Sequence, residues 1–361
     1  MSPMAIELIY RGTLAFVVVN AVMGYGGLLS WLERKQSALM QNRIGANRAS
    51  ILGIRAIGLI HMLSDGIKML TKEDWRPPGA DRLLHTIAPL LSIGFAVLVF
   101  AAIPFGDRIP IQGMSGEWLN LRVCDIDLGL LAVFAILGMG VYGVVLAGLS
   151  SNNNFGLIGA LRAGAQMISY EIALGISIMG IVLIFGTLDL QGITRAQGGT
   201  ILGFLPNWGI FLQPVGFLIF MTAIFAESKR VPFDLPECES EIIGYSVEYS
   251  GMKFGLFLFA DFVESLIGAV LCSILFFGGW QIPWVTPPAD PTWGWALLST
   301  LAFGIKVLFF TWLFMTIRWT FPRFRYDQLM DLCWKIMLPI ALANLVITAI
   351  IVALIRAHGG A

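Results

Sequence analysis

The sequence predicts an all-α polytopic membrane protein with about eight transmembrane helices and one amphipathic helix at the membrane surface. Of its 361 residues, 57% are hydrophobic and only 13% are charged, and the mean hydropathy is +0.80. A soluble domain carries roughly 25% charged residues. Apolar runs of about 18 or more residues recur along the chain, and each is long enough to cross the bilayer as a helix. Such continuous runs exclude the short alternating strands of a transmembrane barrel.

The apolar runs place the membrane helices at 8–31, 85–105, 126–149, 160–186, 209–226, 253–280, 296–317 and 335–356. The run at 253–280 is long, which indicates tilt or an extension beyond the bilayer. The linker after it is rich in Pro and Trp and predicts an interfacial loop with an aromatic belt. We expect the whole chain, 1–361, to form a single membrane domain.

The loop at 32–84 contains the predicted amphipathic helix, at about 52–70. Its apolar residues recur at helical spacing, while Asp65 and Lys68 mark a polar face, so the helix is expected to lie on the membrane rather than cross it. Lys and Arg concentrate in this loop and in the third, fifth and seventh loops. The positive-inside rule therefore predicts that these loops are cytoplasmic and that both termini are periplasmic.

The four cysteines, Cys124, Cys238, Cys272 and Cys333, form no C-x-x-C pair and have no histidine at metal-ligand spacing. Iron–sulfur clusters need clustered thiolates. We therefore expect no metal and no redox cofactor bound by this chain.

Four ionisable residues lie inside the predicted membrane helices. A charge at the bilayer centre costs about 2.5–3.5 kcal/mol, so such residues are candidates for function. Glu171 is too short to reach the headgroups, whereas the long stem of Lys306 leaves a structural role open. Asp261 and Glu264 lie one helical step apart near a helix end, and either a structural or a functional role fits them.

The segment 227–252 predicts an acidic cytoplasmic loop. Pro232 and Pro236 interrupt any helix, and the carboxylates beyond them can begin a new one. Crowded carboxylates in a low dielectric raise one another's pKa, so such a cluster can hold and pass protons. The alternative is a solvated charge run, but apolar residues such as Phe233 favour burial. The carboxylates concerned are Glu227, Asp234, Glu237, Glu239, Glu241 and Glu248.

Six extended motifs, in order along residues 8–356, resemble the family of the H subunit of bacterial NADH–quinone oxidoreductase, whose mitochondrial counterpart is subunit 1 of respiratory complex I. They are LERKQSALMQNRIGANR (32–48), DGIKMLTKE (65–73), SSNNNFGLIGALRAGAQMISYE (150–171), AESKRVPFDLPECESEI (226–242), EYSGMKFGLFLFADF (248–262) and RFRYDQLMDLCWK (323–335).

The resemblance implies a membrane subunit that walls part of a quinone chamber and couples quinone reduction to proton translocation. Quinone would be the substrate, and NADH, FMN and the iron–sulfur clusters would be bound by partner subunits. It implies a location in the bacterial inner membrane, beside redox-arm and antiporter-like subunits. The chamber residues would be Glu33, Arg34, Arg43, Asp65, Glu227, Arg230, Phe233 and Asp234. Proton coupling would involve Glu73, Glu171, Glu237, Glu239, Glu241, Glu248, Asp261, Lys306 and Arg318.

Three positions depart from the family pattern. Ala46 stands where the family usually has Pro, and His61 and Ser64 stand where Gln and Ala are more usual. These changes are expected to alter the turn and the chamber-facing helix, but they remove no proposed carboxylate. The loop at 106–122 is also longer than in compact relatives.

Two other functions remain open from the sequence. The homologous membrane subunit of a membrane-bound hydrogenase, or of an enzyme with another electron donor, would share the helices without needing a quinone entrance. A standalone secondary transporter would also explain buried Glu171 and Lys306, but it should show discontinuous helices and an internal repeat, and the sequence shows neither.

Overall fold

The computed structural model describes residues 3–112, 118–201, 203–235, 244–288 and 290–358. Within these ranges, seven helices are long and apolar enough to cross a membrane, and an eighth is apolar but has only 14 residues. The chain is an all-α polytopic membrane protein, which confirms the predicted fold class. The eight helices are α1 (Pro3–Met40), α3 (Arg82–Leu98), α4 (Gly129–Ser150), α5 (Asn154–Phe185), the short α8 (Pro214–Glu227), α9 (Gly251–Phe276), α10 (Trp293–Thr320) and α12 (Leu338–His358).

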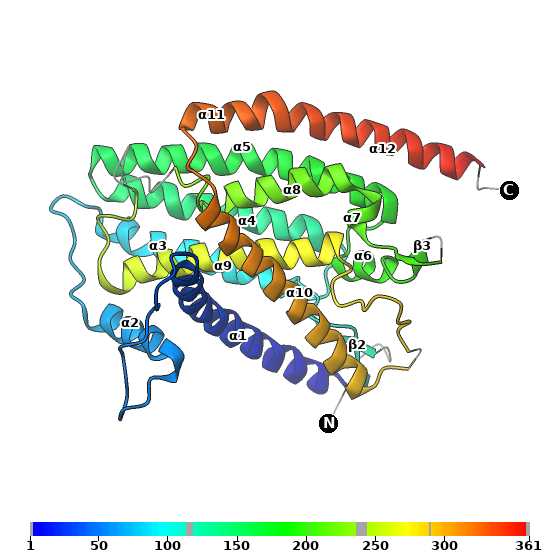
Figure 1. Cartoon of the computed structure of the whole chain (residues 1–361), viewed down its shortest axis with the longest axis horizontal. Coiled ribbons are helices and arrows are strands. Elements are labelled where there is room, and N and C mark those ends of the chain that lie inside the picture. The colour runs from blue at the N-terminus through cyan, green and yellow to red at the C-terminus, as the bar shows by residue number, and fades with distance from the viewer. Residues whose placement is uncertain (1–2, 113–117, 202, 236–243, 289, 359–361) are drawn as a thin grey trace.

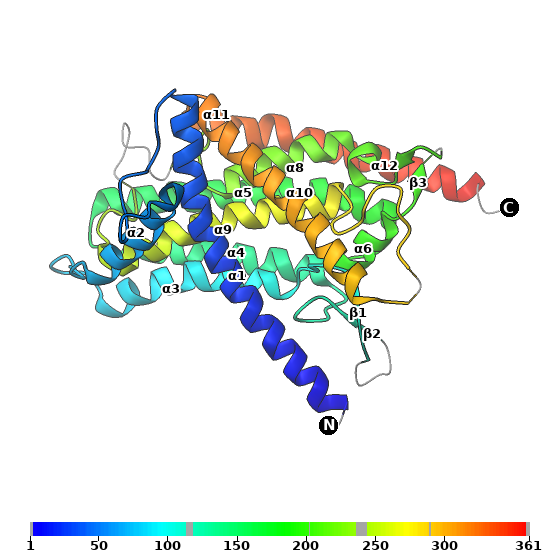
Figure 2. The same ribbon diagram turned by 60° about the horizontal axis from the view of Figure 1, so that its bottom comes forward.

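Helix α9 forms the centre of the bundle. It packs against α1, α3, α8 and α10, and 83% of its most apolar window is buried. The C-terminal helix, by contrast, has only 11% of its window buried and lies along one edge, beside α5 (Figure 1). Helices α1 and α10 cross the other helices obliquely (Figures 1 and 2). Ionisable side chains at membrane depth are therefore best shielded from lipid when they lie on α9.

The bundle has two distinct ends. We call one the basic end, formed among the described residues by 41–81, 151–153, 228–235, 244–250 and 321–325; it includes a 3-10 turn (Ala56–Gly58) and α2 (Ile60–Thr71). The other, the hairpin end, carries two short antiparallel hairpins and both termini (Figures 1 and 2). Its elements are β1 (Arg108–Gln112), β2 (Trp118–Asn120), α6 (Leu190–Ala196), β3 (Thr200–Ile201), β4 (Leu205–Pro206) and α7 (Gly209–Leu212).

At least two helices begin directly after a residue whose side chain accepts hydrogen bonds from the first N–H groups of the helix. The Asn153 side chain accepts the Phe155 N–H at 3.0 Å, so α5 begins at Asn154, six residues before the predicted start at 160. Asp81 accepts from the N–H groups of Leu83 and Leu84 and starts α3 in the same way. These oxygens satisfy N–H groups that have no partner within their helices.

Other predicted boundaries were also wrong. The amphipathic helix begins at Ile60 rather than near 52, because Leu52, Ala56 and Ile57 all adopt positive φ, which an α-helix excludes. The span expected at 209–226 is broken at Gln213, whose φ is −138°, before Pro214 restarts the helix. Glu227 is the last residue of α8 rather than part of the acidic loop.

The last span is longer than predicted. It runs from α11 (Tyr326–Asp331) through a π-helical turn (Leu332–Met337) into α12, so the helix begins nine residues before the expected start at 335. The predicted extended loop at 106–122 contains the β1–β2 pairing at its two ends.

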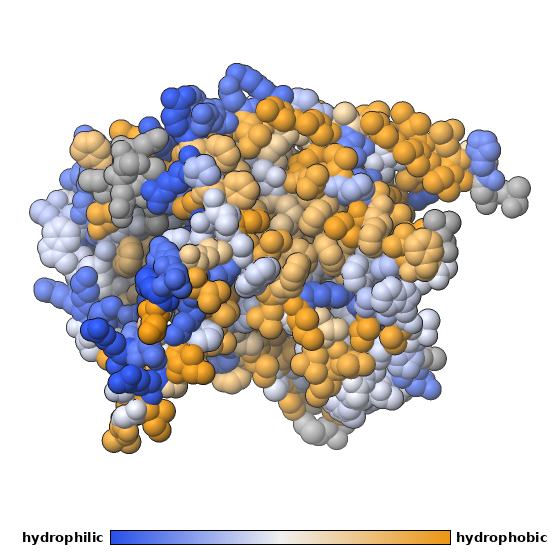
Figure 3. Space-filling view, viewed as in Figure 1, coloured by the Kyte–Doolittle hydropathy of each residue, from blue (hydrophilic) through white to orange (hydrophobic). Residues whose placement is uncertain are grey.

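The surface divides in the same way as the fold. Hydrophilic residues gather at the basic end, whereas hydrophobic residues cover α10 and α12 (Figure 3). The exposed side chains of α12 are almost all aliphatic: Val346, Ile347, Ile350, Ile351, Leu354 and Ile355. In a membrane protein, such a face contacts lipid or another membrane subunit.

Candidate functional site: a buried charge cluster at the basic end

Glu33 near the end of α1 joins three segments of the basic end. Its side chain is only 12% exposed and accepts from Arg318 of α10 and, at 3.4 Å, from Arg230 of the 228–250 loop. The Arg230 guanidinium also lies 4.5 Å from the centre of the Phe262 ring. One carboxylate between two partly buried guanidiniums leaves an excess of positive charge at this point.

Arg34, the next residue, has a different partner. It pairs with Asp65 of α2, which Lys68 also contacts at 2.9 Å. Neighbouring residues on an α-helix point about 100° apart. Burial alone would raise the pKa of Asp65, but hydrogen bonds from Lys68 and Arg34 outweigh it and hold that pKa below its usual range. Glu33 and Arg34 therefore tie α1 to two different elements.

A small cavity of about 60 Å³ lies between α1, α2 and α9. Arg34 and Asp65 supply its charged wall, and Met62, Phe259 and Phe262 supply much of its apolar wall. Gly27 keeps it open to α2, since a Cβ there would lie 2.7 Å from the Met62 sulfur. The cavity combines a flexible methionine wall with one ion pair, and its volume makes it a gap between the helices rather than a ligand-sized pocket.

Lys229 is shared by two carboxylates of α9. Its ammonium lies 3.0 Å from Asp261 and 3.2 Å from Glu264, and its side chain is 4% exposed. Burial by itself would lower the pKa of Lys229. The combined effect of the two carboxylates is larger and opposite, so this pKa lies well above its usual value. Lys229 also adopts φ +52°, a conformation that costs of order 1 kcal/mol for a side chain of this kind. One ammonium group, that of Lys229, is thus shared between the carboxyl groups of Asp261 and Glu264.

Glu227 adds a third carboxylate to this group. It is 5% exposed, and among the described residues its Oε2 has no hydrogen-bond partner. Glu264, Glu171 and Lys229 all act on it electrostatically. A carboxylate buried next to other carboxylates and unpaired is strongly disfavoured in its charged form. The charge of its neighbours therefore acts on Glu227 without a hydrogen-bond donor at Oε2 to offset it.

Glu171 extends the carboxylates towards α4. Its side chain is half buried, and a Cβ on Gly138 of α4 would lie 2.8 Å from its Oε1, so the glycine makes room for the carboxylate. The preceding Tyr170 points elsewhere and donates to the Leu329 carbonyl at 2.8 Å. Among the described residues, the Glu171 carboxylate has no hydrogen-bond partner. The series Glu264, Glu227 and Glu171 thus crosses from α9 through α8 to α5.

The first half of the acidic loop is folded back into the protein. Phe233 stacks on Phe324 with ring centres 5.5 Å apart and lies 5.9 Å from the Tyr170 ring. The Gln166 amide donates to the carbonyls of Ala226 and Phe233, both at 2.8 Å. Asp234 pairs with Arg323 at 3.2 Å. The burial expected from Phe233 is confirmed for this half.

The remaining predicted residues are more scattered. Glu248 accepts a hydrogen bond from the Asn153 amide at 2.7 Å. Two residues further on, the Ser250 hydroxyl donates to the backbone carbonyl of Glu73, whose own side chain is exposed. Arg43 is exposed and contacts only Gln41 among the described residues. Glu237, Glu239 and Glu241 lie outside the described residues.

Lys306 lies apart from this cluster. Its ammonium donates to the carbonyls of Phe277, Gly279 and Gln281 at 2.6–2.8 Å and lies 4.7 Å from the Trp208 ring. These carbonyls follow the C-terminus of α9, about 20 Å along the helix axis from Glu264. Lys306 therefore anchors a turn at the hairpin end, and the structure does not bring it near Glu171.

The three departures from the family pattern have local contacts only. The Ala46 carbonyl lies over Gly58, where a Cβ would approach it to 2.0 Å, so the chain needs glycine at that position. His61 accepts the Ala49 N–H at 3.4 Å, and Ser64 is exposed on α2.

Sequence reasoning left Lys229 out of the site and noted Glu264 only as a membrane-depth candidate beside Asp261, although both residues carry signals. Lys229 adjoins Arg230 in the recognised motif, and Glu264 lies three residues after Asp261, on the same helix face. It also missed Gln166 and Arg323, which position the loop from outside its own sequence. No pattern in the sequence indicates those two contacts.

These features define a polytopic membrane protein that buries an unbalanced cluster of ionisable groups at one membrane surface. The family model described as NADH dehydrogenase matches residues 13–349. An H subunit of the NADH-quinone oxidoreductase of Cytophaga hutchinsonii is 45% identical over 92% of this chain and 94% of its own length. The H subunit of the NADH-quinone oxidoreductase of Thermomicrobium roseum is 42% identical over 96% of each chain, and NADH-quinone oxidoreductase subunit 8 of Rhodothermus marinus is 40% identical over 97% and 99%.

The chain belongs to the NADH dehydrogenase family, among the H subunits of NADH-quinone oxidoreductases. The matches cover nearly its whole length, so they include α1, α2 and the segment 228–235, which contribute to the charge cluster. The resemblance that the six motifs indicate is confirmed. Within the described residues, no group of three His, Cys, Asp or Glu side chains is arranged to hold a metal ion.

Proposed function

We propose that the chain forms part of the quinone chamber of a proton-translocating NADH:quinone oxidoreductase and couples quinone reduction to proton translocation through buried carboxylates. The observation that carries this proposal is the partnerless Glu227 between the Lys229 cluster and Glu171, within the part of the chain that the structure describes. A structural ion pair would leave no carboxylate unpaired at this depth.

The chamber wall would be the surface around the cavity between α1, α2 and α9. The cavity itself is smaller than a quinone ring, so this surface would form one wall of a chamber that partner subunits complete. Its apolar residues would contact the ring and tail, and the Arg34–Asp65 pair would supply polar groups for the carbonyl oxygens. Glu33, Arg230, Phe233 and Asp234 would shape the adjoining loop, since each is fixed by a contact from another segment.

Coupling would follow from the charge balance. Reducing a quinone to a quinol consumes two protons, and drawing them from nearby acids changes the field on Glu227. Each unit by which a neighbour shifts a pKa is worth about 1.4 kcal/mol. A change at Asp261 or Glu264 would therefore alter the protonation of Glu227 and then of Glu171. The acidic residues 237–248 would lie on the same route.

This role assigns the electron-transfer chemistry to partner subunits, which would bind NADH, FMN and the iron–sulfur clusters. The chain itself would hold no complete active site. It would lie in the bacterial inner membrane, with the basic end in the cytoplasm and both termini in the periplasm, as the distribution of Lys and Arg supports. Its neighbours would be the quinone-site redox subunits and the antiporter-like membrane subunits.

The first test is purification of the intact complex that contains this chain. The proposal expects an assembly with NADH-dependent, inhibitor-sensitive quinone reductase activity. Co-purification with a hydrogenase, without NADH oxidation, would contradict it.

The second test separates chemistry from coupling. In complexes with normal subunit content, Glu171→Gln and Glu239→Gln are each expected to lower the number of protons translocated per quinone reduced. Asp331→Asn, an exposed carboxylate paired with Lys335, is the matched control. Normal quinone reduction and full pumping in both variants would rule out the coupling route.

A further inference from the structure

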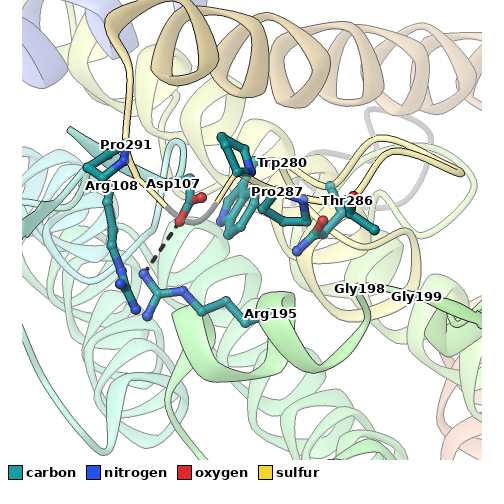
Figure 4. Close-up of a pocket in the computed structure, with 11 residues that line it drawn as sticks. Asp107, Arg108, Arg195, Gly198, Gly199, Trp280, Thr286, Pro287 and Pro291 are labelled. Carbon is teal, nitrogen blue, oxygen red and sulfur yellow. Dashed lines mark hydrogen bonds and ion pairs between the residues drawn. The ribbon is translucent and has the colours of Figure 1, made fainter. Parts of the chain in front are cut away.

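A second, larger cavity lies at the opposite, hairpin end of the molecule (Figure 4). Its volume is about 500 Å³, and it adjoins a further space of about 340 Å³ that shares Gly198, Gly199, Gln281 and Thr286 with it. The walls come from the start of β1, from α6 and the turn after it, and from the loop that follows α9. None of the predicted site residues lines this cavity.

Two guanidiniums face this cavity. The side chains of Arg108 and Arg195 extend from different elements and bring their charged ends close together (Figure 4). Arg195 contacts Asn120 at 2.8 Å and Asp107 at 3.5 Å, whereas Arg108 forms no ion pair among the described residues. Burial, and secondly the nearby Arg108, lower the pKa of Arg195. The two arginines therefore repel each other across the cavity.

The single acid that lines the cavity does not balance them. Asp107 is buried, and besides Arg195 it accepts from the Trp295 indole N–H at 3.0 Å. Among the described residues, the cavity thus has two cations against one carboxylate that is already shared. An anion between the guanidiniums would relieve their repulsion and accept charge-assisted hydrogen bonds from both.

Two buried polar atoms at the cavity also have no partner. Trp280 is 1% exposed and its indole N–H has no acceptor, while Gln281 is 3% exposed and its Oε1 has no donor, counting the described residues. An unsatisfied buried polar group costs about 1–3 kcal/mol. Both residues line the cavity, but these two atoms are themselves shielded from it, so the two guanidiniums alone identify the ligand as an anion.

The surroundings indicate where this ligand comes from. Trp284 and Trp293, at the two ends of the Pro-rich loop, are 72% and 63% exposed. Exposed tryptophans of a membrane protein lie at the level of the lipid headgroups. The cavity therefore opens at a depth where phospholipid phosphates are concentrated.

We propose that the cavity binds a phosphate group between Arg108 and Arg195, carried by an anionic phospholipid headgroup or by free phosphate. Bound there, the phosphate joins β1, α6 and the turn at 277–281. That turn also supplies the three carbonyls that hold Lys306. Occupation stabilises the hairpin end as a unit.

The test uses the intact, delipidated complex in detergent, titrated separately with phosphatidylglycerol, phosphatidylcholine and inorganic phosphate. Thermal unfolding reports binding, because a ligand of the folded state raises the unfolding temperature by mass action. Native mass spectrometry counts the lipids retained. Arg195→Gln and Arg108→Gln remove the two cations. Arg356→Gln is the control, since Arg356 lies outside this cavity on the exposed C-terminal helix.

We expect phosphatidylglycerol to stabilise the parent complex, and each of the two pocket variants to need at least tenfold more of it, while Arg356→Gln matches the parent. Competition by millimolar phosphate would assign the site to free phosphate, and its absence to a headgroup. Arg108 has no protein ion pair among the described residues, so Arg108→Gln remains informative if Arg195→Gln fails to assemble. Unchanged titration in Arg108→Gln, or an equal loss in Arg356→Gln, would overturn the proposal.

Discussion

Two buried groups at opposite ends of the bundle, Lys306 and Glu227, show how a membrane protein treats charge for different purposes. Lys306 has three carbonyl acceptors and an aromatic face, so every proton of its ammonium is accounted for. Glu227 has an oxygen without any partner among the described residues and two other carboxylates nearby. A saturated charge fixes a turn, whereas an unsaturated one responds to its neighbours.

The same contrast holds for the groups around them. At the hairpin end, Arg122 pairs with both Asp125 and Asp189, and hydrogen bonds from Arg122 and Arg11 overcome burial to keep the pKa of Asp125 below its usual value. At the basic end, one lysine serves two acids and leaves a third unpaired among the described residues. Sequence position alone did not separate the two kinds of charge, since Lys306 and Glu171 both stand inside apolar runs.

The largest expected effect is the loss of Lys229. Lys229→Met leaves Asp261 and Glu264 buried without a cation, which costs about 3–5 kcal/mol of folding free energy. We expect little assembled complex, measured as subunit content in membranes. Adding Asp261→Asn and Glu264→Gln to the same variant should restore assembly without restoring pumping. Normal assembly of the single variant would show that the lysine does not balance these acids.

A smaller loss of stability is expected at the hairpin end. Lys306→Met frees three buried carbonyls and should lower the free energy of unfolding by about 2–3 kcal/mol. The complex that does assemble should keep its proton-to-quinone ratio, because Lys306 lies far from the carboxylates. Thermal unfolding and pumping assays check the two parts, with the exposed Lys335→Met as the control. A lower number of protons translocated per quinone reduced, in a variant of unchanged stability, would place Lys306 in the coupling route.

The next effect in size is expected where α4 faces Glu171. Gly138→Ala puts a methyl group 2.8 Å from the present position of the carboxylate and should cost about 1–3 kcal/mol. Gly175→Ala on α5, with open space around its Cβ, should be neutral or stabilise the helix by up to about 1 kcal/mol. Thermal unfolding of the two complexes is the comparison. Equal stability would mean that Glu171 does not occupy the space at Gly138.

The smallest effect concerns pH. The folded-state pKa of Asp65 is lowered, so its pairs with Arg34 and Lys68 stabilise the fold above the ordinary pKa of an aspartate and stop doing so as pH falls through the lower, folded value. Because Arg34 and Lys68 are largely exposed, the contribution near pH 7 should be at most about 1 kcal/mol. Unfolding temperatures of the parent and Asp65→Asn should therefore differ at pH 7 and converge below about pH 4. A constant difference would contradict the assignment.

Much of the fold follows from local sequence, and the site follows only in part. Apolar runs identify the eight helices, and Asn153 and Asp81 supply caps at the residues where α5 and α3 begin. The helix expected at 52–70 fails over its first turns because several non-glycine residues there adopt positive φ, which no local pattern in the sequence indicates. The sequence indicates Glu171 and Asp261 by their depth. It cannot indicate that Lys229 lies between Asp261 and Glu264, because that pairing joins residues about 30 positions apart.

The divergence of Glu33 and Arg34 is an intermediate case. The resemblance assigns both to the quinone chamber, but they contact different elements, and the angle of about 100° between neighbouring helix residues would have predicted that separation. The identity of the partners, Arg318 and Asp65, depends on how α10 and α2 pack against α1, which local patterns do not encode.

The central claim is tested most directly at Glu227, the carboxylate without a partner among the described residues. The measurement is the number of protons translocated per NADH oxidised by the intact complex in sealed vesicles, for the parent, Glu227→Gln and the exposed control Asp331→Asn. Glutamine keeps the shape and removes the charge, so assembly and stability should be preserved. The account predicts at least a twofold lower ratio in Glu227→Gln and the parental ratio in Asp331→Asn. A parental ratio and parental rate in Glu227→Gln would contradict it.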